Sequence, residues 1–455
     1  MSESALHPPV DLAKHHQGQV QTLTKKGPLY RLLRNPALMP YHRLAVLVFA
    51  MNVFAFLQLA ESVSFIHHQI PLPWLLYLTL ANFGVGIFIR QQQVINLLFK
   101  MATSAPKSWP LSIRWALGKV YQFGGIHVGG YFSGTLWLTL FLFTATWGPE
   151  SSFIVPSAVK VLGFFHLCVL LCVMYVALPH YRMVKHNSFE VISRFGNWLS
   201  LGLFWCQALV LIYANCGTES YIFSVFSAPE VYALAYLTFC VARPWLRLKK
   251  IPVDTVTPSN HVAISQFDYG VTPFAGSSTD LSRNPLLEWH SFANIPAPQK
   301  TGFRLCISRA GDWTGQYIDE KPKHLWVKGV PAAGVGNIER LFKKVIWIAT
   351  GSGVGPCLPH LLVQKVPSQL IWSTRSPRDT YGDELVDEIL TAQPEALILD
   401  TTTRGRPDLV SLALEAYRNF EAEAVIVISN KKVTFHVNYE LESRGIPSFG
   451  AIWDS

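Results

Sequence analysis

A chain of 455 residues is long enough for two or three domains, and half of its residues are hydrophobic while only 15% are charged. A soluble protein of this length carries about a quarter charged residues, so the composition excludes a protein that is soluble along its whole length. The net charge of +9 does not indicate a nucleic-acid partner, because the basic residues gather at the ends of apolar runs, as they do in membrane proteins.

Long apolar runs dominate the chain up to about residue 245. A membrane span needs about 20 mostly apolar residues, and six stretches reach this length. We expect the second stretch to leave the bilayer near Arg90 and the glutamines that follow it. The sequence therefore predicts a cytosolic N-terminal segment, residues 1–42, and a six-span transmembrane domain, residues 43–245, with spans at about 43–64, 72–98, 124–147, 157–179, 190–213 and 220–242.

The charges of the connecting segments predict the orientation. Every second segment is basic, and the three others contain no Lys or Arg. Because basic residues favour the cytosolic side, both termini are expected in the cytosol. The chain is thus predicted to be a multi-pass integral protein of the plasma membrane, with the lipid bilayer as partner; no protein partner is indicated. The basic segments carry Lys25, Lys26, Arg31 and Arg34; Lys100, Lys107, Arg114 and Lys119; Arg182 and Lys185; and Arg243, Arg247, Lys249 and Lys250.

Three histidines in or near the spans raise the question of haem, because ionisable groups in hydrocarbon usually have a function. His166 and His180 are separated by about 21 Å along a helix, the spacing of two haems stacked across a bilayer. Each iron needs a second histidine on a neighbouring helix. His127 can serve with His180, but nothing on another span faces His166. Interhelical hydrogen-bonded histidines are therefore the favoured interpretation, and haem ligation is the alternative.

The soluble remainder of the chain consists of two regions with different patterns of predicted secondary structure. Residues 246–342 contain short strands between Gly and Pro turns, such as 261–267, 303–308 and 324–328, which predicts a small antiparallel barrel. From residue 343 to residue 455, strands alternate with helices, which predicts an α/β domain with a doubly wound parallel sheet. The seven cysteines form no CxxC pair and no metal-finger spacing, so they predict buried structural side chains and no metal site.

A glycine-rich turn follows the first buried strand of this α/β region, residues 345–350. Glycines allow the backbone to approach phosphate groups closely, and the N-terminus of the next helix favours negative charge. An arginine at the end of the second strand can meet a ribose 2′-phosphate, although a solvated surface arginine is an equal alternative. The sequence therefore predicts that NAD(P)H binds here, at Gly351, Ser352, Gly353, Gly355, Pro356 and Arg375.

The order of membrane spans, barrel, glycine turn and α/β lobe resembles the ferric reductase and NADPH oxidase superfamily, which carries a ferredoxin-reductase-like module for FAD and NAD(P)H. Within it, the chain is most similar to fungal TmpA-type transmembrane flavoproteins, from about residue 40 to the C-terminus. The resemblance rests on the strings at 185–190, 288–293 and 311–314, the glycine turn, and the terminal Gly450-Ala451-Ile452-Trp453-Asp454-Ser455.

The resemblance assigns roles to individual residues. One four-residue string falls on the flavin motif, and it departs from the family pattern at its second and fourth positions. Two residues match the contacts of the FAD pyrophosphate, and a C-terminal tryptophan takes the place of the aromatic ring that covers the flavin. These residues are His290, Ser291, Phe292 and Ala293; Gly311 and Thr314; and Trp453, which the resemblance places at the catalytic centre.

The resemblance implies a membrane-bound FAD-dependent oxidoreductase that passes hydride from NAD(P)H to FAD and then to an acceptor that the sequence does not identify. The usual quartet of haem ligands cannot be assembled, because the fifth span contains no histidine. Two alternatives stay open. One is a haem-containing ferric reductase or oxidase that sends electrons across the membrane; the other is a flavin-binding redox sensor that turns over poorly.

Overall fold

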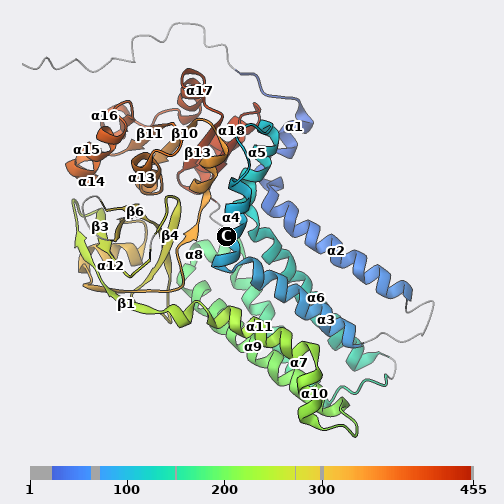
Figure 1. Cartoon of the computed structure of the whole chain (residues 1–455). Coiled ribbons are helices and arrows are strands. Elements are labelled where there is room, and N and C mark those ends of the chain that lie inside the picture. The colour runs from blue at the N-terminus through green and yellow to red at the C-terminus, as the bar shows by residue number, and fades with distance from the viewer. Residues whose placement is uncertain (1–22, 63–71, 149–150, 272, 298–301, 452–455) are drawn as a thin grey trace, which may run out of the picture.

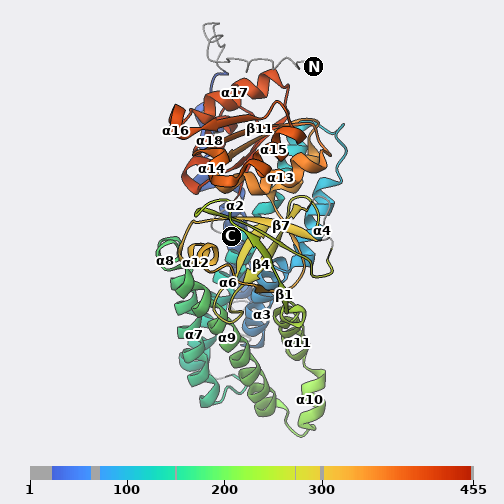
Figure 2. The same ribbon diagram turned by 90° about the vertical axis from the view of Figure 1, so that its left-hand side faces the viewer.

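The structure is a computed structural model that describes residues 23–62, 72–148, 151–271, 273–297 and 302–451. Long helices run side by side at one end of the molecule, and the β-rich parts lie at the other end (Figure 1). The view at 90° shows the parallel sheet at the end opposite to α10, with the barrel between the sheet and the helices (Figure 2).

The helical bundle consists of long apolar helices packed through small residues. On α6, a Cβ added to Gly125 would lie 1.9 Å from the Tyr41 carbonyl oxygen, and one added to Gly130 would lie 2.7 Å from the Asn82 carbonyl oxygen. Glycine is thus needed for the close approach of α6 to α2 and α3, as is common in membrane helix pairs. The helices are α2 (Pro40–Ser62), α3 (Leu72–Ile89), α6 (Gly124–Trp147), α7 (Ser157–Val176), α9 (His186–Asn215), α10 (Tyr221–Ser227) and α11 (Pro229–Ala242).

The predicted bundle of six continuous spans is not what the structure contains. Among the described residues, five helices are long and apolar enough to cross a membrane, and a sixth is counted only if α10 and α11, bent by 65° at their junction, form one span. The bend falls before Pro229, whose ring cannot continue the hydrogen bonding of a helix. The second run ends at Ile89, next to Arg90, as expected.

Several segments predicted as loops are short helices. The basic segment after the second run forms α4 (Gln92–Thr103), α5 (Leu111–Leu117) and η4 (Gly118–Gln122). These elements leave the bundle and pack on the α/β domain, where the buried ring of Trp115 belongs to the same core as Phe342 and Phe449. The other short elements are α1 (Pro28–Leu33), η2 (Pro36–Leu38), α8 (Pro179–Val184) and η5 (Trp245–Arg247).

The predicted antiparallel barrel is present and contains one helix that the sequence reading missed. Its two sheets run β1-β8-β4-β5, with β9 on β4, and β2-β3-β7-β6. Buried Phe267, Phe303 and Tyr317 fill the interior. The elements are β1 (Lys249–Pro252), β2 (Asp254–Val256), β3 (Val262–Phe267), β4 (Ser277–Ser282), β5 (His290–Ala293), β6 (Ile295–Pro296), β7 (Phe303–Ser308), α12 (Asp312–Glu320), β8 (His324–Val327), β9 (Ala332–Ala333) and η6 (Val335–Leu341).

The α/β domain has the predicted parallel sheet, in the order β12-β11-β10-β13-β14. Continuous apolar runs such as that of β10 are buried on both faces, as expected for a strand covered by helices on two sides. The elements are β10 (Val345–Thr350), η7 (Gly351–Gly353), α13 (Val354–Val363), β11 (Ser368–Thr374), α14 (Pro377–Tyr381), α15 (Asp383–Ala392), β12 (Leu397–Asp400), α16 (Thr401–Arg404), α17 (Leu409–Asn419), β13 (Ala424–Ile428), α18 (Lys431–Glu442) and β14 (Ser448–Gly450).

Ion pairs join the helical part to the α/β domain. Arg114 of α5 donates through both terminal nitrogens to Glu423, at 2.6 and 3.1 Å. Lys119 of η4 pairs with Glu442 of α18 at 2.5 Å, and Lys25 pairs with Glu440 at 2.7 Å. The sheet is therefore docked on the helices rather than joined to them by the chain alone. The predicted domain limits at 42, 245 and 342 stay predictions.

Candidate nucleotide-binding site

The turn after β10 lies where the strand order of the sheet reverses. The chain continues from β10 to β11 and β12 on one side, and to β13 and β14 on the other. A crevice forms outside the carboxyl ends of the strands at such a switch point, and open α/β sheets bind their ligands there. The turn is η7, and α13 begins directly after it at Val354. The predicted glycine turn thus occupies this position.

Two glycines of the turn are required by its geometry. Gly351 has φ +51, a conformation that strains other residues. A Cβ on Gly353 would lie 2.1 Å from the Ile428 carbonyl oxygen at the end of β13. Trp372 of β11 donates its indole N–H to the Gly351 carbonyl at 2.9 Å, while the side chain of Ser352 is exposed at the tip. The backbone is therefore held close to both neighbouring strands, with its tip open to a ligand.

The start of α13 connects this turn to the barrel. A Cβ on Gly355 would lie 3.5 Å from the Cβ of Cys306 on β7, and Pro356 lies in the first turn, where a missing N–H costs nothing. The Cys357 thiol donates to the Gly353 carbonyl at 3.2 Å. Burial raises the pKa of Cys357, so this thiol stays protonated and has a structural role.

Polar side chains lie beside the turn, at the carboxyl ends of β10 and β13. The hydroxyl groups of Thr350 and Ser429 are hydrogen-bonded to each other across the ends of β10 and β13. Asn430 accepts from the Val433 amide at 3.1 Å and caps α18. These contacts hold the carboxyl ends of the two central strands in a fixed relation.

Arg375 follows β11 on the same edge of the sheet. Its side chain is exposed, and it makes no ion pair within the part of the chain that the structure describes. Arg378, by contrast, is held by Asp383 and Asp387, each at 2.7 Å. A guanidinium group without a carboxylate partner is suited to a phosphate. Its contact with a 2′-phosphate stays a prediction.

The predicted flavin string occupies β5 of the barrel. The His290 ring stacks on Trp313 with a centroid distance of 4.2 Å, and Phe292 lies 5.9 Å from the same indole ring. His290 Nε2 is buried without a hydrogen-bond partner among the described residues. Burial lowers the pKa of His290, so its imidazole is neutral at pH 7. Ser291 is exposed and Ala293 is half-buried.

The two residues predicted to contact a pyrophosphate form the cap of α12. The Thr314 hydroxyl accepts from the amide groups of Ala310 and Gly311, at 2.9 and 3.1 Å. These amides are therefore already hydrogen-bonded within the chain. The structure brings β5 and the turn together, because α13 packs against β5 and β6. The cofactor roles of both sets of residues stay predictions, and Trp453 lies outside the described residues.

Two histidines of the helical bundle make contacts between helices. His127 Nδ1 donates to the Gly86 carbonyl at 3.0 Å, and Gln207 Nε2 donates to His166 Nδ1 at 3.1 Å. Both histidines thus make the interhelical hydrogen bonds that the sequence analysis favoured, while the choice between this interpretation and haem ligation stays a prediction. His180 is exposed on α8.

Two arrangements of ionisable side chains could not be predicted from the sequence: an acid–histidine pair that involves α13 and a lysine between two tryptophans. Buried Glu339 lies 2.7 Å from Nδ1 of buried His360 on α13. Lys328 lies between two indole rings, 4.0 Å from the centre of Trp289 and 5.0 Å from that of Trp245. In the sequence these residues are marked only as charged residues within apolar stretches. The partner of each one is set by packing between elements that are far apart in the sequence.

Comparison with known proteins points to a class that the sequence reading did not name. Residues 335–455 match the family model of the C-terminal domain of adenylate-forming reductase 03009. Adenylate-forming reductase 03009 of Coprinopsis cinerea is 40% identical over 94% of this chain, and adenylate-forming reductase 06235 of the same fungus is 38% identical over 94%. The chain spans 42% of the length of each of these curated relatives.

Solved ferredoxin reductases are similar to part of the chain in fold only. A ferredoxin NADP+ reductase from Neisseria gonorrhoeae with bound FAD and NADP aligns with 45% of this chain and 98% of its own, at 13% identity and a TM-score of 0.36. The ferredoxin reductase in carbazole 1,9a-dioxygenase aligns with 45% of this chain and 69% of its own, at 14% identity and a TM-score of 0.36.

These findings correct the family and the function expected from the sequence. The relatives that match 94% of the chain are adenylate-forming reductases, so the assignment to TmpA-type flavoproteins of the ferric reductase and NADPH oxidase superfamily is wrong. The membrane-bound FAD oxidoreductase and its two alternatives depended on that assignment and are withdrawn with it. The motifs behind the resemblance are strings of four to six residues, which are too short to distinguish one family from another. A shared fold does not distinguish them either, because one fold carries many functions.

Proposed function

We propose that this chain is a nicotinamide-nucleotide-dependent reductase unit whose acceptor is an acyl group activated as an adenylate. The names of the curated relatives supply the reaction class, and the observation that carries the proposal is the glycine turn at the switch point of the sheet. Its two required glycines and its exposed tip at Ser352 suit a nucleotide pyrophosphate. Adenylate formation itself is not proposed for this chain.

The chemistry explains why adenylate formation and reduction belong together. A carboxylate resists hydride because it is negatively charged and lacks a leaving group, whereas an acyl adenylate has an electrophilic carbonyl and can release AMP. In the proposed reaction, hydride from the nicotinamide ring adds to the acyl carbon. The bond from that carbon to the AMP oxygen breaks, AMP leaves with the bonding electrons, and an aldehyde and the oxidised nucleotide form. The protein supplies binding and orientation.

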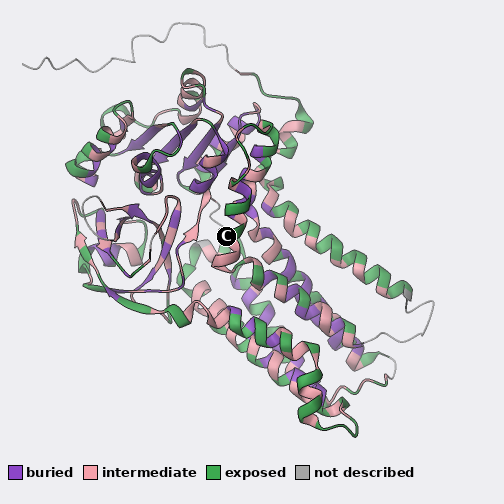
Figure 3. Ribbon diagram, viewed as in Figure 1, coloured by how far each residue is buried: buried purple, intermediate pink, exposed green. Residues whose placement is uncertain are grey.

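We also propose that the helical bundle lies in a lipid bilayer with both termini on the cytosolic side. The 18-residue window within Pro36–Glu61 is 0% buried inside the protein, and Val46 and Phe54 are each 64% exposed. Figure 3 presents most of α2 as exposed surface. Apolar surface of this extent is unfavourable in water, so a lipid environment accounts for it. Resistance of the full chain to alkaline extraction from isolated membranes tests this; release into the soluble fraction would contradict it.

Binding of NADPH and NADH to the purified chain tests the nucleotide site. Gly353→Ala places a methyl group against the Ile428 carbonyl, and we expect the dissociation constant to rise about tenfold or more. Gly202→Ala in α9 is the matched control, because a Cβ there meets nothing within 4 Å. Absence of binding to the wild-type chain, or equal binding by Gly353→Ala, would refute the site.

Oxidation of NADPH, followed at 340 nm after addition of synthetic benzoyl adenylate, tests the reaction. We expect the absorbance to fall while benzaldehyde forms, with the free acid inactive as acceptor. Tight NADPH binding with neither change for any acyl adenylate would refute the proposed acceptor while leaving the nucleotide site in place.

A further inference from the structure

A cavity of 610 Å³ lies in the helical bundle, lined by residues from α3, α9, α10 and α11 and by Phe153. It is at the end of the molecule that carries α10, opposite to the parallel sheet (Figures 1 and 2). Its volume is within the range of small-molecule sites, about 300–1,000 Å³. The position separates it from the nucleotide turn, so it is a distinct site.

The cavity lies at the break between α10 and α11. The two helices are bent by 65° on either side of Ala228. Local hydrogen bonds satisfy carbonyl groups of α10, because the Tyr232 hydroxyl donates to the Phe226 carbonyl at 2.6 Å and the Ser227 hydroxyl to the Phe223 carbonyl at 2.8 Å. The break is thus a formed element of the bundle. Broken helices in membrane proteins typically line a cavity that holds a ligand.

The lining combines apolar walls with negative charge. Two of the lining residues are acidic, Glu219 and Glu230, and none of the described lining residues is Lys, Arg or His. Several neutral polar groups are already bound by the protein. Asn215 Nδ2 donates to the Ile154 carbonyl at 2.9 Å, Gln207 is bonded to His166, and the Ser224 hydroxyl faces Glu219 Oε2 at 3.5 Å. Most of the polar lining is therefore satisfied without a ligand.

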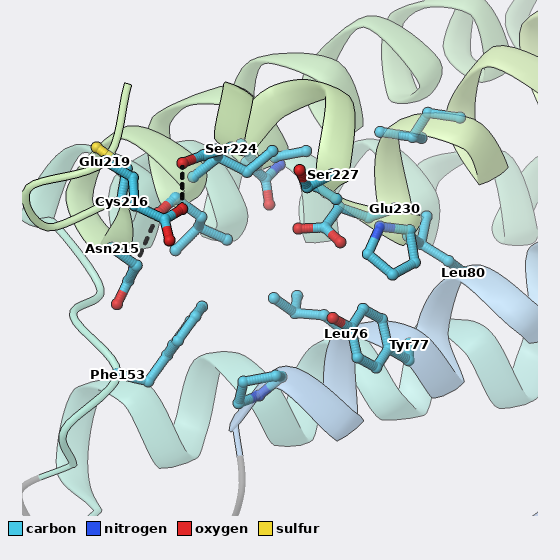
Figure 4. Close-up of a pocket in the computed structure, with 18 of the residues that line it drawn as sticks. Leu76, Tyr77, Leu80, Phe153, Asn215, Cys216, Glu219, Ser224, Ser227 and Glu230 are labelled. Carbon is cyan, nitrogen blue, oxygen red and sulfur yellow. Dashed lines mark hydrogen bonds between the residues drawn. The ribbon is translucent and has the colours of Figure 1, made fainter. Parts of the chain in front are cut away.

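Glu230 is the exception. Its Oε2 atom is buried and has no hydrogen-bond partner among the described residues. Figure 4 shows its carboxylate directed into the cavity, with Leu76 and Tyr77 of α3 on the opposite wall. Glu230 also lines a neighbouring cavity of 510 Å³ between α3 and α11. A buried carboxylate oxygen without a partner is costly, and a positive group in the cavity would remove that cost.

We infer that this cavity binds a lipophilic organic cation, with its positive centre at Glu230 and its apolar body against the walls formed by α3 and α9. The ring of Tyr77 on the opposite wall can contribute a cation–π contact. The site selects for charge through the carboxylate and for hydrophobic size through residues such as Leu80, Phe204 and Leu211. Inorganic cations lack the apolar body and bind weakly.

Tetraphenylphosphonium and tetraphenylborate provide a matched pair of probes, because they share one shape and differ in the sign of the charge. Equilibrium dialysis of each ion against the full chain in detergent micelles, corrected with protein-free micelles, measures saturable binding. We expect saturable binding of the phosphonium ion with one site per chain, and none of the borate ion. We expect Glu230→Gln to raise the dissociation constant for the phosphonium ion about tenfold or more.

Glu61→Gln is the matched control, because Glu61 is an exposed carboxylate at the end of α2 and does not line the cavity. It should bind the phosphonium ion like the wild type. Ala208→Phe, which fills the cavity without a change of charge, should also abolish binding, and unchanged thermal melting shows that each variant is folded. Equal saturable binding of both ions, or a Glu230→Gln variant that binds like the wild type, would overturn the inference.

Discussion

Replacement of Arg114 by alanine tests whether the ion pairs hold the α/β domain on the helices. The Arg114 guanidinium donates twice to Glu423 and once each to the carbonyl groups of Trp109 and Leu341, at 2.8 Å. The side chain of Arg114 is 5% exposed and that of Glu423 is 20% exposed. The alanine variant leaves a largely buried carboxylate and two carbonyl groups without this donor.

The size of the effect follows from this burial. Removal of one partner from a buried ion pair costs about 3–5 kcal/mol. Because water reaches Glu423 in part, we expect a loss at the lower end, about 3 kcal/mol. At about 4 °C per kcal/mol for a domain of roughly 110 residues, the melting temperature of the α/β domain should fall by about 12 °C. Arg309→Ala removes an exposed pair with Asp319 and should change little.

The pH dependence gives a second test of the same pair. Burial raises the pKa of Glu423, but hydrogen bonds from Arg114 and from the Lys343 amide, together with the charges of these two residues, outweigh burial and hold that pKa below its usual range. The stabilisation is therefore present above the pKa of the unfolded chain, about 4.3, and is lost as the pH falls through the folded value. Melts of wild type and Arg114→Ala, followed by circular dichroism, should differ most at pH 7, and the difference should narrow below about pH 4 to the part that comes from the two carbonyl groups. A difference under 2 °C at pH 7, or one that does not narrow in acid, would refute the reasoning.

Three further predictions concern single side chains. Arg375→Ala should raise the dissociation constant for NADPH about tenfold and should have little effect on that for NADH. The control Arg378→Ala, which removes a side chain already paired with carboxylates, should change neither constant. An equal effect of Arg375→Ala on both nucleotides would contradict a contact with the 2′-phosphate. Burial lowers the pKa of Lys328 to about 8, so above that pH the folded protein releases a proton that the unfolded chain keeps to about pH 10.4. In thermal melts, the stability of the wild type should therefore rise relative to that of Lys328→Met between pH 8 and pH 10. Melting temperatures of the two proteins that change in parallel over this range would contradict the lowered pKa. Burial raises the pKa of Cys306 to about 12, so iodoacetamide at pH 8 should label half-buried Cys216 and leave Cys306 unmodified until the protein unfolds, as mass spectrometry can show.

Regular periodicity made much of the fold predictable from the sequence. The apolar run at 345–350 and the short strand at 303–308 have the predicted limits in the structure, because apolar side chains between turn residues mark a strand locally. The helix α12 was missed because the string around Trp313 contains polar residues, and its helical state depends on the cap by Thr314. The break at Pro229 is marked in the sequence only by the proline itself, and many continuous helices also begin with a proline.

The position of the glycine turn could also be predicted from local sequence. Glycines between a buried strand and a helix mark the turn that joins them, and Gly351 and Gly353 lie in that turn in the structure. The pairing of Glu339 with His360, and the orphaned oxygen of Glu230, depend on contacts between elements that are distant in sequence. A single sequence carries no information on such contacts. The resemblance to flavoproteins rested on strings of four to six residues, and strings this short do not define a family, whereas the matches to adenylate-forming reductases extend over 94% of the chain.

The ion pairs of the α/β domain also change the meaning of the basic segments. Arg114 and Lys119 were counted as cytosolic markers of membrane topology, yet both are held by acidic residues of the sheet domain, Glu423 and Glu442. A Cβ on Gly118, between them in the chain, would lie 2.6 Å from the Phe449 ring, so this segment is shaped to fit β14. Part of the charge bias therefore arises from docking. The proposed orientation of the bundle therefore cannot be argued from a count of basic residues alone, because Arg114 and Lys119 already have partners in the α/β domain.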